Sequence, residues 1–200
     1  DSLFLHGILN PKNKISKIMS RFVCLTGNGQ PGNEPHLSIT DGGCTDLNGD
    51  GYKDYLFATN FGYSTLPRNM YSYDIRNDSL SVSGINGYHI TGLIPDDLDG
   101  DGVKEILVNG YASQNYKDTV AYPIHDLSCW LIVLDNMLHY RFDPVPFPLK
   151  GYSNLNTRII AGDKGIKRLY SIYCPPLDFG LPASLMVFSP DGRLIRKKEM

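Results

Sequence analysis

Short runs of apolar or alternating residues, separated by turn residues, recur along the whole chain. In four places two such runs flank Asn, Asp, Gly or Pro, which favour tight connections between antiparallel strands. These pairs are 3–5 with 15–18, 70–74 with 79–82, 130–134 with 138–142, and 185–188 with 193–195. The pattern predicts a β-hairpin at each place.

A longer element repeats between these hairpins. Residues 46–56 read DLNGDGYKDYL and residues 97–107 read DLDGDGVKEIL, and the two segments align without gaps. A third, eroded copy at 165–170, GIKRLY, aligns with 102–107. Each unit therefore reads strand, acidic loop, strand and hairpin, which makes four strands in about 50–60 residues, as in a propeller blade.

The repeat predicts an all-β fold of four-stranded, β-propeller-type blades, with about three units in one domain over residues 1–200. We expect a leading partial blade at 1–35, a blade with the first acidic loop at 36–87, a blade with the second at 88–150, and a degenerate blade at 151–200. Closed propellers usually have about four to eight blades. The chain is therefore expected to be a partial propeller or a fragment of a longer chain, with the missing blades supplied by the parent chain or by self-association.

The acidic loops have the spacing of a site for a hard cation. The order D-x-[DN]-x-D-G offers oxygen atoms at alternate positions, and calcium takes several oxygen ligands at once. Gly51 and Gly102 fall where the backbone must curl tightly. The seventh position, Tyr52 or Val103, would offer its carbonyl. The ninth, Asp54 or Glu105, would offer its carboxylate.

Two other interpretations of the loops are weaker. An EF-hand needs a bidentate Glu at position 12 and helices on both sides, but position 12 is Phe57 or Val108, inside a strand-like run. A polar turn without metal needs one or two Asp or Asn residues. It does not need an alternating set with a ninth-position acid, twice.

The doubled loop resembles the FG-GAP repeats of integrin α-subunit propellers and the related bacterial VCBS repeats. Residues 87–88 and 108–112 fit the aromatic-Gly start and the small-residue strand end of those repeats loosely. The resemblance covers residues 36–112 well and 157–200 weakly. It implies two calcium sites, one with side-chain ligands at Asp46, Asn48, Asp50 and Asp54, the other at Asp97, Asp99, Asp101 and Glu105.

The third unit departs from this pattern. Its equivalents of ligand positions 1, 3, 5 and 9 are Ile160, Gly162, Lys164 and Arg168. Two of these residues are cations, which repel calcium and have no lone pair to donate. No metal is expected there, and the short, Gly-rich segment 162–165 predicts a tight hairpin turn.

Composition narrows the function. The net charge is −2 and no basic stripe indicates nucleic acid. No apolar run reaches the roughly 18 residues of a membrane helix. The five histidines are scattered and no nucleophile or phosphate-binding motif occurs, so we expect a non-catalytic module that recognises a protein or carbohydrate ligand.

Two alternatives stay open: the sensor ectodomain of a bacterial membrane receptor or signalling kinase, and an ancillary or catalytic domain of a polysaccharide-degrading enzyme. The long connection at 111–128 is the first candidate for a binding surface. Tyrosines in predicted loops could stack on sugars, namely Tyr63, Tyr111, Tyr116, Tyr122 and Tyr152.

The resemblance implies an extracytoplasmic location, which would be periplasmic, cell-surface or secreted. The sequence starts at Asp1 without a signal peptide, so we expect that a leader was removed or that the chain was cut from a longer one. Cys24, Cys44, Cys129 and Cys174 show no CxxC spacing. Two disulfides and isolated buried thiols are both compatible with them.

Overall fold

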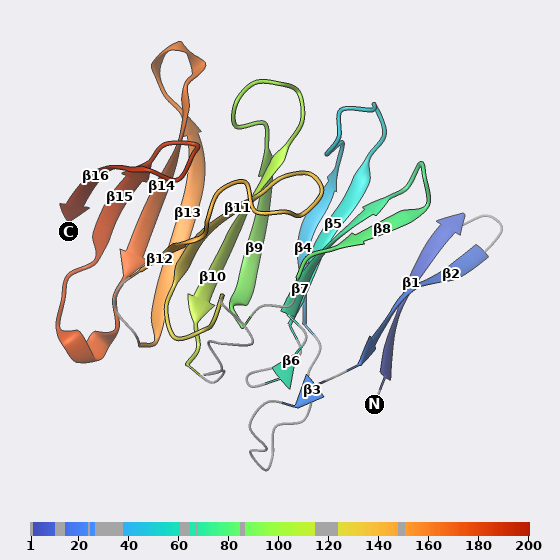
Figure 1. Cartoon of the computed structure of the whole chain (residues 1–200), viewed down its shortest axis with the longest axis horizontal. Helices are drawn as coiled ribbons and strands as arrows, with labels where there is room; N and C mark the ends of the chain where they lie inside the picture. Colours follow the sequence, from blue (N-terminus) through green and yellow to red (C-terminus); the bar gives the residue numbers. More distant parts are fainter. Residues whose placement is uncertain are drawn as a thin grey trace.

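The computed structural model describes residues 2–10, 15–23, 25–26, 38–60, 65–66, 68–84, 87–114, 124–147 and 151–200. Within them the fold is all-β, as predicted, with two short 3-10 turns at Asp163–Gly165 and Leu177–Phe179 (Figure 1). No helix in these segments is long and apolar enough to cross a membrane. The thiols of Cys44, Cys129 and Cys174 are free, and Cys24 lies outside the described residues.

Most strands form three successive antiparallel groups in which neighbours in the chain are neighbours in the sheet. Unit 1 contains β4 (Ser38–Thr45), β5 (Asp54–Asn60), β7 (Arg68–Asp74) and β8 (Ser79–Val82). Unit 2 contains β9 (His89–Asp96), β10 (Glu105–Ala112), β11 (Trp130–Leu134) and β12 (Val145–Pro146). Unit 3 contains β13 (Ser153–Ala161), β14 (Lys167–Cys174), β15 (Ser184–Phe188) and β16 (Leu194–Glu199). This is the strand order predicted for the repeating unit.

Units 2 and 3 are joined into one curled sheet, whereas unit 1 is a separate four-stranded sheet. The join is β10: its first half pairs with β11, and its residues Gly110–Ala112 pair with β13. The side chain of Asn109 sits at the switch, where it accepts the Thr157 N–H (2.8 Å) and donates to the Thr157 carbonyl (3.1 Å). A carboxamide that replaces a main-chain pair in this way lets two sheets diverge without leaving buried backbone groups unpaired.

A second asparagine does the same between units 1 and 2. Asn60, at the end of β5, accepts the Ile90 N–H (3.0 Å) and donates to the Ile90 carbonyl (2.9 Å). Both asparagines are buried. Each therefore fixes the second strand of one unit to the first strand of the next.

Three of the four predicted hairpins are present: β1 (Ser2–Asn10) with β2 (Ile15–Val23), β7 with β8, and β15 with β16. The second strand predicted at 138–142 is wrong. The Asp135 carboxylate accepts the N–H groups of Met137 and His139 and holds a turn in which Leu138 has φ 66. Only an isolated bridge remains there, between Leu134 and Tyr140, and β11 pairs with β12 instead. A further short pair joins β3 (Leu25–Thr26) and β6 (Thr65–Leu66).

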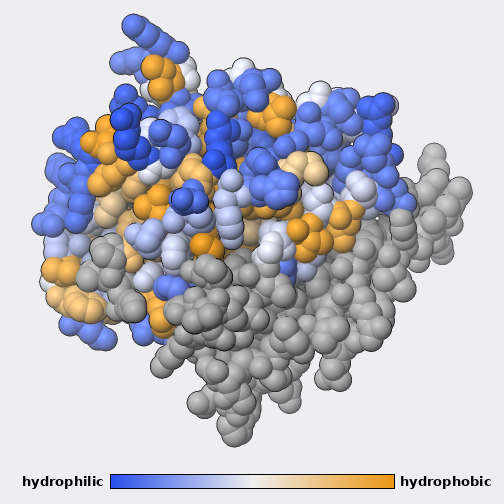
Figure 2. Space-filling model, viewed as in Figure 1, coloured by the Kyte–Doolittle hydropathy of each residue, from blue (hydrophilic) through white to orange (hydrophobic). Residues whose placement is uncertain are grey.

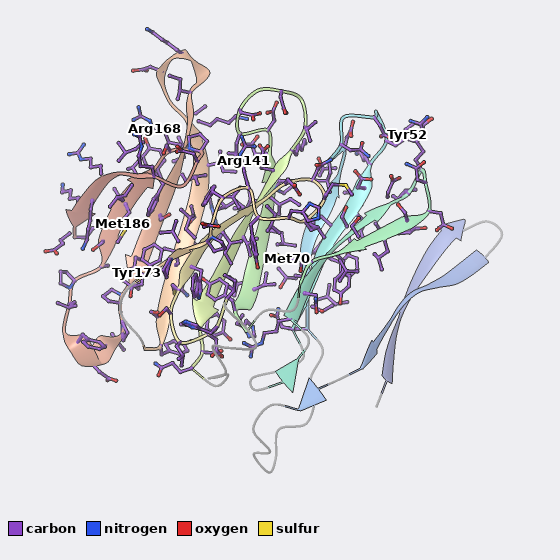
Figure 3. The ribbon with its side chains drawn as sticks, viewed as in Figure 1. Tyr52, Met70, Arg141, Arg168, Tyr173 and Met186 are labelled. Atoms are coloured by element: carbon purple, nitrogen blue, oxygen red, sulfur yellow. The ribbon has the colours of Figure 1, made fainter. Side chains whose placement is uncertain are left out.

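Two hydrophobic clusters hold the units together (Figure 3). The first contains Met70 of unit 1 and Ile106 of unit 2; the second contains Leu107 of unit 2 and Met186 of unit 3. Because successive strand residues point to opposite faces, β10 and β11 contribute to both clusters. This explains why their sequences read as continuous apolar runs.

The connections between the first two strands of each unit, β4–β5, β9–β10 and β13–β14, all lie at the same edge of the molecule (Figure 1, top). Hydrophilic residues gather along that edge in Figure 2. The fold thus places both acidic loops and the third turn side by side.

Candidate metal centre

The first acidic loop is organised around the carboxylate of Asp46. Its two oxygens accept the N–H groups of Gly49 (2.8 Å) and Gly51 (2.9 Å). The carboxylate of Asp50 accepts the N–H of Tyr52 at 2.8 Å. The loop therefore wraps its own backbone around the acidic side chains.

The second loop repeats this arrangement position by position. Asp97 accepts the N–H groups of Gly100 (2.7 Å) and Gly102 (3.0 Å), and Asp101 accepts the Val103 N–H at 2.8 Å. The same spacing thus folds in the same way twice.

Glycines make both wraps possible. Gly49 and Gly51 have φ of 76° and 86°, and Gly100 and Gly102 have φ of 83° and 90°. Residues with a Cβ rarely adopt this left-handed region. The repeat predicts this role for the sixth-position glycines, Gly51 and Gly102; the fourth-position pair, Gly49 and Gly100, was not predicted although both copies carry it.

The ninth-position acids, Asp54 and Glu105, bond back to the start of each loop. Asp54 accepts the Leu47 N–H (3.0 Å) and Glu105 accepts the Leu98 N–H (2.8 Å). Both acids are buried, at 3% and 4% exposure. Burial raises the pKa of both carboxyl groups above the usual range, and neighbouring carboxylates add to the effect. Each ionised acid therefore gains from a nearby cation.

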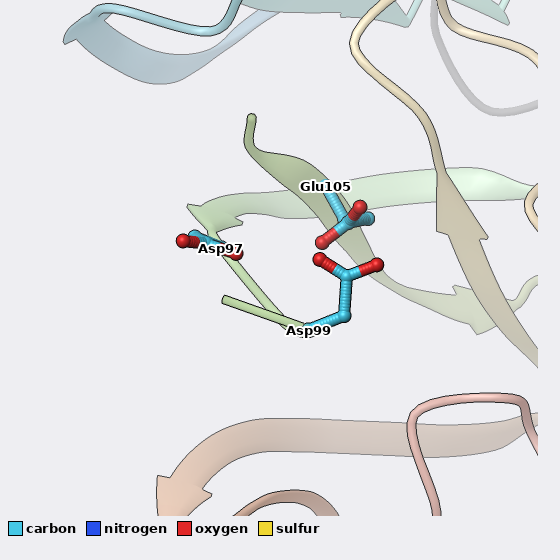
Figure 4. A group of neighbouring side chains, drawn as sticks. All are labelled: Asp97, Asp99 and Glu105. Carbon is cyan, nitrogen blue, oxygen red and sulfur yellow. The ribbon is translucent and has the colours of Figure 1, made fainter. Parts of the chain in front are cut away.

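The carboxylates converge more closely in the second loop. Asp97, Asp99 and Glu105 each offer an oxygen within 4.8 Å of the others (Figure 4). Among the described residues this is the one group of acidic, His or Cys side chains so arranged. In the first loop the middle position is the neutral Asn48, and Asp50 lies 3.3 Å from the guanidinium of Arg76.

The protein already supplies a cation to each loop, which sequence reasoning missed. Arg141, from the connection between β11 and β12, donates to Glu105 and to Asp99, the latter at 2.7 Å. Its hydrogen bond lowers the pKa of Asp99. Arg76, from the β7–β8 turn, contacts Asp50 and lies 4.7 Å from the Tyr52 ring centroid. Both arginines are distant in sequence from the loops, so no local pattern reveals them.

Lysines at the eighth position link neighbouring units. Lys104 donates to the Thr45 hydroxyl (2.6 Å) and, through its backbone N–H, to the Leu47 carbonyl (3.0 Å). Lys167, at the equivalent place in unit 3, donates to Asp96 (2.8 Å) and to the Asp97 carbonyl. Each connection therefore bonds to the preceding acidic loop or the residue before it.

The third connection is a tight hairpin turn, as predicted. Gly162 N–H bonds to the Ile166 carbonyl at 2.9 Å, and Lys164 takes a left-handed conformation with φ 63. The side chains of Lys164 and Arg168 are exposed.

The long connection at 111–128 is described only in part, because residues 115–123 lie outside the described segments. At its base the buried Arg68 and Asp126 form an ion pair at 3.4 Å. Nearby, the Tyr111 ring lies 4.4 Å from His89 and 5.7 Å from the exposed Tyr152, between ring centroids. The binding surface predicted there stays a prediction, and Tyr63, Tyr116 and Tyr122 lie outside the described residues.

Comparison with protein-family models, with curated proteins and with solved structures found no match to this chain. The resemblance to FG-GAP and VCBS repeats therefore rests on the doubled loop alone.

Proposed function

We propose that this chain is a non-catalytic, extracytoplasmic recognition module in which calcium braces two loops of propeller-type blades. The observation that carries the proposal is the repeated loop geometry, with a first carboxylate that holds two glycine amides and a buried ninth-position acid. Calcium prefers this donor chemistry, oxygen from carboxylates and backbone carbonyls. Protein or carbohydrate ligands would bind to the scaffold that the loops stabilise.

The donor set of the second loop fits calcium best. Asp97, Asp99 and Glu105 already converge. Calcium bound there would neutralise these carboxylates, and Arg141 would share them or move away. In the first loop, Asn48 reduces the charge by one. Affinity rises with ligand charge, so we expect the second loop to bind more tightly unless Arg141 offsets the difference.

Bracing is favoured over catalysis because the loops connect the first two strands of their units and bond to their neighbours through Lys104 and Lys167. An ion in either loop would fix the position of that loop relative to the next unit. The described residues favour neither the sensor nor the polysaccharide-degrading alternative.

Calorimetric titration with calcium tests this proposal. We expect two ions per chain, and Asp50→Ala and Asp101→Ala should each remove one. Asp163→Ala, in the third turn, is the matched control and should keep both. A wild-type chain that gives no binding heat, or variants that titrate like it, would refute the proposal.

A further inference from the structure

The face of unit 3 that points away from unit 2 is an exposed sheet surface with an apolar middle and cations at its border. Strand register places Arg158, Tyr170, Val187 and Arg196 in one row across β13, β14, β15 and β16. The next row contains Asn156, Ile172, Leu185 and Lys198. The opposite face of the same strands is buried in the second hydrophobic cluster, through residues such as Leu169 and Met186.

This outer face is hollowed. A shallow groove of about 350 Å³ has Arg168, Arg196 and Lys198 at its rim and Tyr170, Leu185 and Val187 on its floor. A second hollow of about 380 Å³, at the β13–β14 turn, shares Arg168 and Tyr170 with it and adds Lys164 and one acid, Asp163. The two hollows therefore meet at Arg168 and Tyr170, which both lie on β14. Figure 3 labels Arg168.

The cations at the border of this groove have no ion-pair partner among the described residues. Arg168, Arg196 and Lys198 form no ion pair with any described residue, and neither row contains an acid. Elsewhere Arg76 and Arg141 do form ion pairs with carboxylates of the acidic loops. Unpaired cations gathered around an apolar floor attract an anionic partner.

The repeat shows that the charge of this face is inverted relative to unit 2. Arg168 stands where unit 2 has Glu105, and Lys164 stands where it has Asp101. Ile160, which pairs with Arg168, occupies the place of Asp96, which pairs with Glu105 and whose carboxylate accepts Lys167 in unit 2. Another unit of this kind, docking through its lysine, would therefore miss the carboxylate that Lys167 finds in Asp96.

We propose that the outer face of unit 3 binds an acidic polysaccharide, whose carboxylates or sulfates contact Arg168, Arg196 and Lys198 while a sugar ring rests on Tyr170. The inference rests on the recognition function proposed above but not on the metal in the loops. Arg158 and Arg196 stand three strand spacings apart, about 14 Å, which suits several charges along one extended chain. Protein partners are usually anchored by large residues in well-packed pockets, whereas this groove lies open on a sheet surface with three cations at its border.

The test uses the whole chain with surfaces coated in polygalacturonate, dextran sulfate, neutral dextran or polyglutamate, in chelator. Binding to dextran sulfate is also measured in calcium. We expect binding to at least one acidic polysaccharide and none to neutral dextran. The double variant Arg196→Gln/Lys198→Gln should bind about tenfold more weakly, because two exposed charge contacts are lost. The polysaccharide with the higher affinity identifies the anion as carboxylate or sulfate.

The matched control is Arg193→Gln/Lys197→Gln. It removes the same charge from the β15–β16 turn and from the opposite face of β16, where Lys197 pairs with Met186. Equal losses in both double variants would overturn the proposal, because net charge alone would then explain binding. Tighter binding to polyglutamate would overturn it in favour of an acidic protein, and no binding to either acidic polysaccharide would also refute it. If the chain does not bind calcium but shows the expected binding to acidic polysaccharide, only the metal proposal is refuted.

Discussion

The β9–β10 loop and the β13–β14 turn make the same kind of connection with different chemistry. Both join adjacent antiparallel strands at the same edge. The turn closes through the main-chain bond between Gly162 and Ile166. The loop instead uses the carboxylates of Asp97 and Asp101 as acceptors and crowds Asp99 and Glu105 beside them. Joining the strands does not require this concentration of negative charge, which the calcium proposed above would offset.

The largest expected difference between the loop and the turn is their effect on stabilisation by calcium. A ligand that binds only the native state stabilises it by about 2.7 kcal/mol at a hundredfold excess over Kd. We expect calcium to raise the melting temperature above that in chelator, and Asp101→Ala to reduce the increase. Asp163→Ala, in the turn, should leave the increase intact. A melting temperature that chelator does not change would contradict calcium stabilisation of either loop.

The ninth position allows a second comparison at equivalent sites. Glu105→Ala removes a buried acid, leaves the Leu98 N–H without its acceptor and leaves Arg141 with Asp99 alone. We expect a loss of about 2 kcal/mol in the free energy of unfolding in chelator. Arg168→Ala changes an exposed side chain, and the change should stay within about 0.5 kcal/mol. Guanidine denaturation of both variants measures the difference, and similar losses would contradict the structural role assigned to the buried acid.

The features that could be predicted from the sequence are local ones. The loop fold follows from alternate acids and Gly51 or Gly102, because each acid bonds to amides two to five residues away. The strand order of the units followed from apolar runs between turn residues. The failure at 138–142 is also local: the Asp135 carboxylate competes with strand pairing by binding nearby amides.

The features that could not be predicted depend on residues far apart in the chain. Arg141 reaches Asp99, and Asn109 reaches Thr157, only after the units have packed. The hydrophobic periodicity of the sequence does not identify Arg141 or Asn109, because each makes its contact through a single polar side chain. The identity of the units as propeller blades also stays a prediction, since the β10–β13 pairing joins units 2 and 3 in one curled sheet.

The arginines allow a third, smaller test. Arg141 is 26% exposed and contacts two acids of the second loop, whereas Arg76 is 51% exposed and contacts one acid of the first. Arg141→Gln should therefore raise calcium affinity about fivefold, an effect of about 1 kcal/mol. Arg76→Gln should change it less than twofold. Calorimetry decides, and weaker binding in Arg141→Gln would mean that the arginine orients the ligands instead of competing with calcium.

A half-buried histidine, His89, adds a pH test away from the loops. Burial, with the nearby Arg68 adding to it, lowers the pKa of His89 to about 4 from an ordinary value of 6.5. The neutral ring thus contributes stability that is present above pH 6.5 and is lost as the pH falls from 6.5 through 4. His89→Gln should flatten this part of the stability curve in chelator, as denaturation at a series of pH values would show. An unchanged slope would assign the pH dependence to other groups.

The smallest expected effect concerns the left-handed residues of the two connections. In the loop these are Gly100 and Gly102, at φ 83 and 90; in the turn they are Lys164, at φ 63, and Gly165, at φ 74. A side chain in this region costs free energy that glycine avoids, although glycine loses more entropy on folding. Lys164→Gly should therefore raise the free energy of unfolding by about 0.5 kcal/mol, whereas Gly102→Ala should lower it by about 1 kcal/mol.

Lys164 also lines the hollow that contains Arg168 and Tyr170. If Lys164→Gly stabilises the protein and weakens its binding to acidic polysaccharide, the strained lysine is retained for binding. If it lowers stability, the lysine side chain supports the turn, and the comparison with Gly102 fails.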